Sequence, residues 1–321
     1  MDQSLAALGN PAVLFFLLGA LAAFARSDLA VPDAVAKGLS IFLMMSIGLR
    51  GGVEVAHVGL GSAVATAAAL GLGLSALLPF PAFLALRRIG RQDIVNAAAI
   101  AGHYGSVSVV TFVTGHDILI GRGLAPAGYM VAVVALMETP AIVSALLLAN
   151  RARGPESPGS PLSDLLREVL VNGSVVLLAG SFVIGMIIGD AGFKPIAPLF
   201  DGLFKGALCL FLLDMGLVAA RRLIDARLLT PALAALGVAL PLVQGAIGVS
   251  IATALGFAPG TAAEFGILAA SASYIAVPAA MRLALPAADP GRYLTMSLGI
   301  TFPFNIIIGI ALYTSLALAL A

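Results

Sequence analysis

The stretch KGLSIFLMMSIGL (residues 37–49) returns in the second half of the chain as KGALCLFLLDMGL (residues 205–217), 168 residues later. The same shift places NAAAIAG (96–102) on EFGILAA (264–270). After a slip of five residues, Pro140 of the first half meets Pro303 of the second. A duplicated apolar chain with polar interruptions at matching places is typical of secondary transporters. The repeat therefore predicts two related halves.

The composition is that of a membrane protein. Hydrophobic residues make up 60% of the 321 residues and charged residues only 10%, whereas about a quarter of the residues in a soluble domain are charged. Uncharged runs at 94–115, 169–189, 228–263 and 293–321 can each cross a hydrocarbon core of ~30 Å, which takes about 20 helical residues. Period-two alternation is absent, so we expect an all-α protein that passes many times through the inner membrane of a bacterium.

The first apolar run, residues 11–25, is interpreted as a structural helix rather than a signal peptide. Asp2 is the only charged residue before Arg26, so the run lacks a basic leader. It also has a counterpart in the repeat at residues 173–189. The single cysteine, Cys209, excludes an intramolecular disulfide and a multi-cysteine metal cluster. A net charge of +1 provides no basic surface for nucleic acid.

Apolar runs and turn residues predict ten transmembrane helices, five in each half, at residues 5–25, 35–50, 58–86, 94–113 and 124–150, then 165–189, 203–220, 229–256, 262–284 and 292–320. The first repeat spans 1–150 and the second 163–321, and a cytoplasmic linker rich in Pro, Gly and Ser joins them at 151–162. An odd number of spans per half makes the second half enter the membrane from the opposite side. The predicted repeat is therefore inverted.

Basic residues fall mostly on one side of this arrangement. Loops after odd-numbered helices hold thirteen of the seventeen, namely Arg26, Lys37, Arg87, Arg88, Arg91, Arg151, Arg153, Arg167, Arg221, Arg222, Arg227, Arg282 and Arg292. The other loops hold Arg50, Arg122, Lys194 and Lys205. Because basic loops stay in the cytoplasm, both termini are predicted to face the periplasm or the outside.

Predicted helices 4 and 9 carry small and hydroxyl residues near mid-span, where a lipid-facing helix would carry Leu, Ile or Val. The candidate anion-binding residues are Gly105, Ser106, Val107 and Ser108 in helix 4 and Ser271, Ser273, Tyr274, Ile275 and Ala276 in helix 9. Gly and Ser let a backbone unwind. Two half-helix N-termini, each worth roughly half a positive charge, would then hold one small monovalent anion. The alternative is a seam of small residues that serves helix packing.

Polar residues inside the membrane are costly and are therefore candidates for cation binding. The candidates are Thr111, Glu138, Asn305 and Asp214. Glu138, beside Pro140, either binds a cation or supports the break in helix 4. Asp214 either couples a proton or cation or pairs with Lys205.

Other polar residues have simpler interpretations. His103 is expected to make a packing hydrogen bond. Asn96 and Glu264 are expected to cap helix starts. The Glu54/His57 pair is expected in a solvated loop.

Several motifs together resemble the sodium-dependent bicarbonate permeases first described in cyanobacteria. They are IGLRGG (47–52), GSVS (105–108), METPA (137–141) with LAN (148–150), LFKG (203–206) with MG (215–216), and AASAS (269–273). The resemblance covers nearly the whole chain. It implies a five-plus-five inverted repeat, a homotrimer, a gate domain of helices 1, 2, 6 and 7, and a core domain of helices 3–5 and 8–10. It also implies an anion site where broken helices 4 and 9 cross.

Two residues depart from the cyanobacterial pattern, which has an acidic residue at the position of Tyr274 and a serine at the position of Ala276. The loss of a carboxylate and a hydroxyl group alters the set of oxygens that could bind sodium. The linker is also shorter than in cyanobacterial members. A regulatory partner of the PII-like class is known for the family, but nothing in this sequence supports one.

The sequence thus predicts a secondary active transporter that imports bicarbonate or a similar small monovalent anion, coupled to sodium, by alternating access. The alternative is a proton-coupled or exchange carrier of another small carboxylate. An anion channel needs a continuous polar pore, which the few charges per helix disfavour. We expect no enzyme and no cofactor beyond a coupling sodium ion, because three histidines and one cysteine supply neither a nucleophile with a base nor a metal cluster.

Overall fold

The computed structural model describes residues 10–59, 61–153, 173–224, 229–274 and 276–321, and over these residues it is all-helical. Eight helical stretches among them are long and apolar enough to cross a membrane: Asp33–His57, Ser62–Arg88, Ile94–Gly121, Met130–Asn150, Val176–Phe193, Ala197–Ile224, Pro231–Ala254 and Pro290–Leu320. A shorter apolar helix covers Pro11–Phe24. The all-α, multi-pass membrane fold is confirmed, and the ten-helix inverted repeat stays a prediction.

The helices before residue 154 are α2 (Pro11–Phe24), α3 (Asp33–Val58), α4 (Ser62–Leu77), α5 (Pro79–Arg88), α6 (Ile94–Gly105), α7 (Val109–Gly121), α8 (Met130–Met137) and α9 (Pro140–Arg153). Those from residue 173 to residue 284 are α11 (Gly173–Phe193), α12 (Ala197–Phe200), α13 (Phe204–Ile224), α14 (Pro231–Ala254), α15 (Pro259–Ala270) and α16 (Ala276–Ala284). The last stretch alternates α-helix with π-helix: α17 (Pro290–Leu294), η1 (Thr295–Thr301), α18 (Phe302–Phe304), η2 (Asn305–Gly309) and α19 (Ile310–Leu320).

Polar caps determine where helices begin. The Asn10 side chain accepts a hydrogen bond from the Ala12 amide at 2.9 Å, and Pro11 occupies the first position of α2. Asp93 accepts one from the Asn96 amide at 2.9 Å and so caps α6. Such caps satisfy amide groups that the helix itself leaves without an acceptor. The cap is therefore Asp93, three residues before Asn96, which was expected to be the cap.

Helices α2, α3, α11 and α13 form one bundle, in which α3 packs along α11 and α13 packs along α2. A Cβ on Gly48 of α3 would lie 2.6 Å from the Ser181 Cβ of α11. A Cβ on Gly216 of α13 would overlap the Phe16 carbonyl oxygen of α2. These glycines therefore allow the backbones to touch, as is usual between membrane helices. Gly48 and Gly216 are partners under the 168-residue shift, so matching residues of the two halves make matching contacts.

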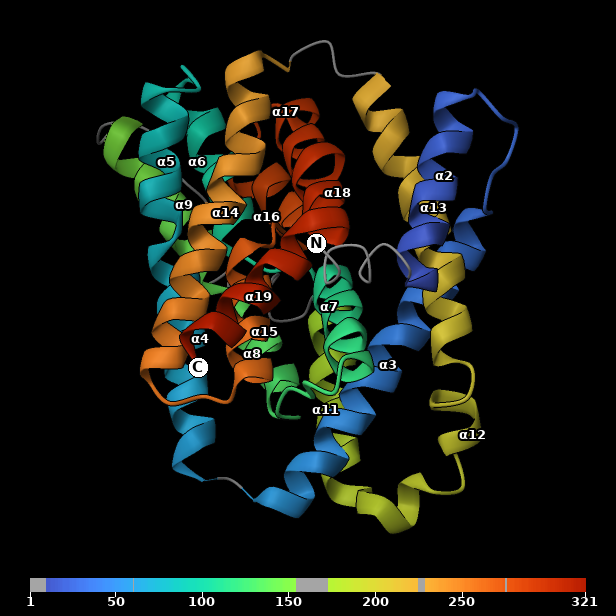
Figure 1. The fold of residues 1–321 in the computed structure, drawn as a ribbon. Helices are drawn as coiled ribbons and strands as arrows, with labels where there is room; N and C mark the ends of the chain where they lie inside the picture. The colour runs from blue at the N-terminus through green and yellow to red at the C-terminus, as the bar shows by residue number, and fades with distance from the viewer. Residues whose placement is uncertain (1–9, 60, 154–172, 225–228, 275) are drawn as a thin grey trace.

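The remaining helices surround the two interrupted ones, α6–α7 and α15–α16. Helix α9 packs on α6, α14 packs along α15, and α7 contacts α15. Figure 1 shows α7, α15 and α16 in the middle of the molecule. Residues 96–105 of α6 and 109–115 of α7 are buried, as is α15 from Gly260 onward. The interrupted helices therefore lie inside the protein and do not face the lipid.

The junction between α8 and α9 lies at Glu138 and Thr139, just before Pro140. Proline has no amide hydrogen and interrupts the helical hydrogen bonds at this point. Ser75 of α4 bridges the interruption: its hydroxyl donates to the Met137 carbonyl at 2.7 Å and accepts from the Ala141 amide at 3.2 Å. A side chain from a neighbouring helix thus replaces the lost backbone bonds, as buried irregular backbone requires.

The Glu54/His57 pair is not in a loop. Helix α3 continues to Val58, eight residues beyond the predicted helix 35–50. The extra turns find polar partners, because Glu54 Oε1 accepts a hydrogen bond from the Gly128 amide at 2.9 Å and His57 pairs with Asp190.

The helices end at two opposite faces of the molecule. The ends of α5 and α13 and the beginnings of α6, α14 and α17 lie at the upper end in Figure 1, whereas the α3–α4 and α7–α8 connections lie at the lower end. The last turns of α5 and α13 carry Arg87, Arg88, Arg221 and Arg222. These four arginines belong to the thirteen basic residues that were predicted to share one side of the membrane, and they lie together at the upper end. Most of the predicted linker at 151–162 lies outside the described residues.

Candidate functional site

Two helix breaks with similar local sequence and geometry meet at the centre of the protein. Helix α6 ends at Gly105 and is followed by Ser106-Val107-Ser108, and α15 ends at Ala270 and is followed by Ser271-Ala272-Ser273. Ser106 has φ −86° and ψ 175°, and Ser271 has φ −78° and ψ 158°. Both chains therefore leave their helices in an extended conformation, with serine side chains available to bond the freed backbone.

The constant 168-residue shift is wrong at these breaks. The ends of α6 and α15 are 165 residues apart, so Ser106 corresponds to Ser271 and Ser108 corresponds to Ser273. The three-residue difference was invisible in the sequence because this part of the chain consists largely of interchangeable small residues. A 168-residue shift would pair Gly105 with Ser273, whereas the helix ends pair Gly105 with Ala270.

The two breaks are hydrogen-bonded to each other. The Ser108 amide donates to the Ser271 hydroxyl at 3.0 Å, and the Ser273 amide donates to the His103 carbonyl at 2.9 Å. His103 Nδ1 lies 2.5 Å from the Ser273 carbonyl oxygen. His103 therefore makes a packing hydrogen bond, as expected. All four side chains are buried, so the crossing is shielded from water.

Serines also begin the second half of each interrupted helix. Ser108 Oγ accepts from the Thr111 amide at 3.2 Å and is the N-cap of α7. Ser273 Oγ accepts from the Val277 amide of α16 at 3.4 Å. The N-termini of α7 and α16 thus start from one hydrogen-bonded crossing. Helix N-termini carry partial positive charge and unpaired amide groups, which are suited to an anion.

The predicted anion-binding residues do not all play the same part. A Cβ on Gly105 would lie 2.9 Å from the Ala141 Cβ and would overlap Pro79, so Gly105 serves close packing against α5 and α9. Val107 is buried inside the first break. Ala276 is the first residue of α16, and Ile275 lies outside the described residues.

Tyr274 places an aromatic ring and a hydroxyl group beside the crossing. Its ring packs edge-on against Phe302 with centroids 5.4 Å apart. Its hydroxyl lies close to Ser108, but the separation or angle falls short of a hydrogen bond, and this buried oxygen has no partner among the described residues. An unpaired buried hydroxyl group is uncommon in proteins, which marks this atom as available to a ligand.

Three of the four cation candidates lie near the crossing. The Ser106 hydroxyl is 3.4 Å from both the backbone carbonyl and Oε2 of Glu138. Thr111 is buried in the first turn of α7. Asn305 of η2 donates to the Ala270 carbonyl at 2.8 Å, so it caps the end of α15, and its own oxygen accepts from Tyr313 at 3.2 Å.

Asp214 belongs to the α2–α3–α11–α13 bundle instead. Its charged neighbours are Asp33 of α3 and Arg221 of α13. It does not pair with Lys205, whose ammonium group lies 3.7 Å from Asp117 of α7. The sequence alternative of an Asp214–Lys205 ion pair is therefore wrong.

A buried ion pair that the sequence did not predict joins the two interrupted helices. Glu264 was expected to cap a helix start, but α15 begins at Pro259 and Glu264 lies inside it. Its carboxylate is 2.7 Å from the His116 ring of α7. The one sequence feature that could have found it is a lone carboxylate after a long uncharged run, a pattern that marks functional residues in membranes.

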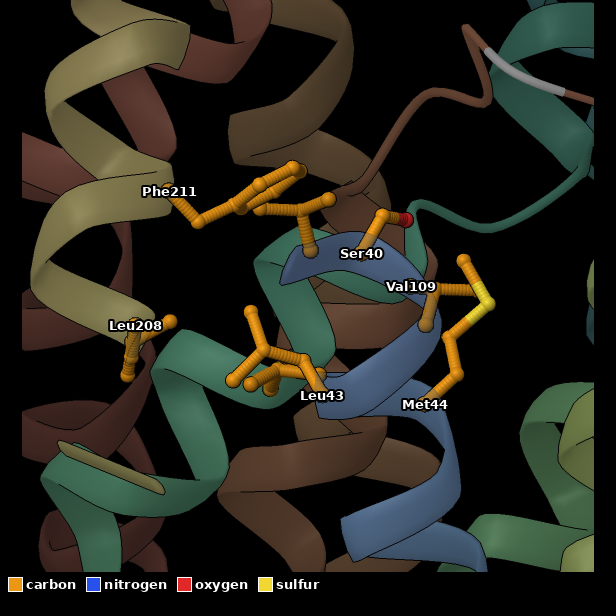
Figure 2. Close-up of a pocket in the computed structure, with 8 residues that line it drawn as sticks. Ser40, Leu43, Met44, Val109, Leu208 and Phe211 are labelled. Carbon is orange, nitrogen blue, oxygen red and sulfur yellow. The ribbon is translucent and has the colours of Figure 1, made fainter. Parts of the chain in front are cut away.

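A small hollow lies beside the N-terminus of α7, and we call it the α7 hollow. It is lined by Ser40, Leu43, Met44, Val109, Val110, Val113, Leu208 and Phe211. Figure 2 shows these side chains converging from α3, α7 and α13. Its volume of about 10 Å³ is roughly that of one water molecule. The hollow separates the first turn of α7 from the α2–α3–α11–α13 bundle.

The chain was compared with known proteins and protein families. A search of curated proteins found no match. The model of one protein family, described as the Na⁺-dependent bicarbonate transporter superfamily, matches residues 11–318 of the 321. That match includes both breaks and every helix that contacts them, and it covers almost the whole chain. The chain therefore belongs to the Na⁺-dependent bicarbonate transporter superfamily.

Proposed function

We propose that this protein imports bicarbonate, or a similar small monovalent anion, and that the anion binds where the α6–α7 and α15–α16 breaks cross. The family supplies the substrate class. The observation that carries the site is the buried Ser108–Ser271 contact between the two breaks, which lead into the N-termini of α7 and α16. Each N-terminus is worth roughly half a positive charge, so the pair offsets about one negative charge. A monovalent anion fits this balance.

Hydrogen-bond donors at the crossing support the same proposal. The amides of Val109 and Val110 occupy the first two positions of α7, where helix geometry provides no intrahelical acceptor. The buried Tyr274 hydroxyl adds a donor that has no partner among the described residues. Bicarbonate offers oxygen acceptors to such groups, and it enters without a buried arginine or lysine because the helix termini compensate its charge.

Transport by alternating access would use the two bodies of the protein. The α2–α3–α11–α13 bundle corresponds to the gate domain, and the helices around the crossing correspond to the core domain of a five-plus-five repeat. The α7 hollow between these bodies has room for about one water molecule. Bicarbonate is larger, so α3 and α13 must move away from α7 to admit it from that side. A separation of the two bodies on the opposite face would release the bicarbonate.

Sodium coupling, as the family name implies, needs several oxygen ligands near the anion. The oxygens available around the crossing belong to Ser106, Thr111, Glu138, Ser273 and Asn305. Glu138 contributes the one carboxylate among them and lies beside Ser106. Tyr274 stands where a carboxylate is expected, so we propose weak sodium binding.

The upper end of the molecule in Figure 1 would face the cytoplasm, because it carries the arginine-rich ends of α5 and α13. Both chain termini would then face the periplasm. Accessibility of tags on the two termini to protease in right-side-out cells tests this orientation. Protection of both tags would overturn it. The homotrimer implied by the resemblance also stays a proposal.

Purified protein in liposomes provides the direct test of function. We expect uptake of radiolabelled bicarbonate above that of empty liposomes, with competition by other small monovalent anions, and a modest increase when sodium is raised outside. Ser271→Ala, which removes the hydrogen bond from the Ser108 amide to the Ser271 hydroxyl, should reduce uptake at limiting bicarbonate. Absence of uptake by the unmodified protein under any cation gradient would overturn the proposed substrate.

A further inference from the structure

A histidine–glutamate pair connects the two interrupted helices away from the anion crossing. His116 Nδ1 of α7 lies 2.7 Å from Glu264 Oε1 of α15. The Glu264 side chain is completely buried, whereas 17% of the His116 side chain is exposed. A buried carboxylate requires either a proton or a counter-charge, and the imidazole ring is the group placed to provide one. The exposed part of His116 is the route by which we expect protons to reach the pair.

Packing fixes this pair in position. Gly115 precedes His116, and a Cβ there would lie 2.8 Å from Ile267 Cδ1 of α15. The absent side chain lets α7 and α15 approach closely enough for the ring to reach the carboxylate. The Phe112 ring lies 5.5 Å from the His116 ring and covers its side toward the break. The pair is therefore a built feature of the helix–helix contact.

Glu264 is only partly satisfied by this contact. Its second oxygen, Oε2, is buried and has no hydrogen-bond partner in the described part of the chain. An unsatisfied oxygen is far less costly on a neutral carboxylic acid than on a carboxylate. The pair therefore favours holding a proton, either on Glu264 or on His116.

The charges around the pair are few. Glu54 and Arg50 of α3 act on it, and Arg50 has its own partner in Asp201. Asp117, next in sequence to His116, is 3.7 Å from Lys205. Helices α14 and α19, which pack on α15, contain no charged residue. Glu54 is thus the nearby carboxylate against which the role of Glu264 can be compared.

The pair lies on the same two helices that form the crossing. His116 follows Ser108 by eight residues, which is about 12 Å along α7. At that distance and an effective dielectric constant of about 20, one negative charge at the crossing would change the proton affinity of the pair by about tenfold. An anion and a proton would therefore favour each other's binding.

We propose that His116 and Glu264 form a proton-binding site that couples anion transport to protons, an inference that rests on the proposed function. The pair takes one proton from the outer water when the crossing takes one anion. Both leave on the inner side, and the pair returns to its starting protonation. Without sodium, each cycle then moves one proton with one monovalent anion, so no net charge crosses the membrane.

Titration of the histidines tests the site without any transport measurement. The chain has only three histidines, so ¹⁵N-histidine NMR of the full-length protein in nanodiscs can be assigned with His57→Asn and His116→Asn variants. We expect saturating bicarbonate to raise the proton affinity of the His116–Glu264 pair by about tenfold. Glu264→Gln should lower the proton affinity of His116, because it removes the counter-charge of the imidazole ring. A His116 resonance that titrates identically with and without bicarbonate in the unmodified protein would overturn the proposal.

Transport in liposomes tests coupling. At a fixed bicarbonate concentration and without sodium, an inward proton gradient should stimulate uptake by the unmodified protein. Glu264→Gln and His116→Asn should lose this stimulation but keep bicarbonate exchange, which needs no net proton movement and shows that the crossing is intact. The matched control, Glu54→Gln, should keep the stimulation.

The two proposals fail in different ways. Uptake by the unmodified protein that ignores the proton gradient would overturn the proton site and leave the proposed function standing. The proton site would also be overturned if Glu264→Gln kept the stimulation. Absence of both uptake and exchange in the unmodified protein would overturn the proposed function itself.

Discussion

The two helix breaks are nearly identical in local structure and different in their surroundings. Each consists of a Ser-X-Ser segment that leaves its helix in an extended conformation, and each places a serine at the start of the next half-helix. The first break is bordered by Glu138 at 3.4 Å from Ser106. The second is held by Asn305, which donates to the Ala270 carbonyl. One break thus has an ionisable neighbour and the other a neutral amide.

This difference suggests that the two breaks together bind the anion, whereas their different neighbours bind the cation. The shared serines and helix N-termini would bind the anion, which needs donors from both sides. The unequal partners, Glu138 and Asn305, would make the two faces of the crossing distinct for a cation. The packing is unequal too, since Gly105 allows contact with α5 and α9 whereas the matching residue of the second half is Ala270.

The largest effect should come from Gly105→Val, because even a Cβ there would lie 2.9 Å from Ala141 Cβ and overlap Pro79. We expect the free energy of unfolding to fall by about 1–3 kcal/mol or more, with loss of uptake. The midpoint of thermal unfolding in detergent and bicarbonate uptake would be measured. The matching change Ala270→Gly should reduce stability by about 1 kcal/mol. If the two variants lost stability and uptake to the same extent, the packing at the two breaks would not differ as we propose.

Asn305→Leu should have an effect of similar size on stability. It leaves the Ala270 carbonyl and the Tyr313 hydroxyl without their partner, and each buried group left unsatisfied costs about 1–3 kcal/mol.

Glu138→Gln, by contrast, preserves the contact with Ser106 and should change stability little while reducing the response to sodium. Thermal unfolding and sodium-dependent uptake separate the two variants. Full sodium dependence in Glu138→Gln would exclude that carboxylate from the cation site.

Removal of the capping serines should affect both breaks alike. Ser108→Ala and Ser273→Ala each remove a cap worth about 1 kcal/mol of stability. If the hydroxyl groups also contact the anion, each variant should weaken its binding by about 1.5–3 kcal/mol, the contribution of a hydrogen bond to a charged group. The concentration of bicarbonate at half-maximal uptake measures this. A large effect at only one of the two serines would show that the anion is bound by one break.

The smallest effect is expected from restoring the cyanobacterial pattern in the second break. Tyr274→Asp together with Ala276→Ser supplies a carboxylate and a hydroxyl group beside the crossing. We expect sodium to stimulate uptake at lower concentrations than in the unmodified protein, because a carboxylate offsets much of the desolvation cost of the ion. Uptake is measured against external sodium at fixed pH. Tight, saturable sodium dependence in the unmodified protein that the double variant abolishes would contradict this prediction.

Local sequence predicted the breaks but not their relationship. Ser106, Ser108, Ser271 and Ser273 stand out because small polar residues interrupt an apolar run, and a helix interruption is decided within a few residues. The 165-residue correspondence could not be found in this way. Alanine, glycine and leucine align almost equally well in several registers, so only the positions of the helix ends revealed the three-residue difference.

The sequence by itself determined the membrane class, the all-α fold and the place of the two breaks, because hydropathy and helix interruption are properties of short segments. The tertiary structure alone decided which side chains meet. It brought Asn305 to the end of α15, His116 to Glu264, and Lys205 to Asp117 rather than Asp214. Contacts of this kind join residues that are far apart in the chain, so they depend on the register and packing of whole helices, which no local pattern encodes.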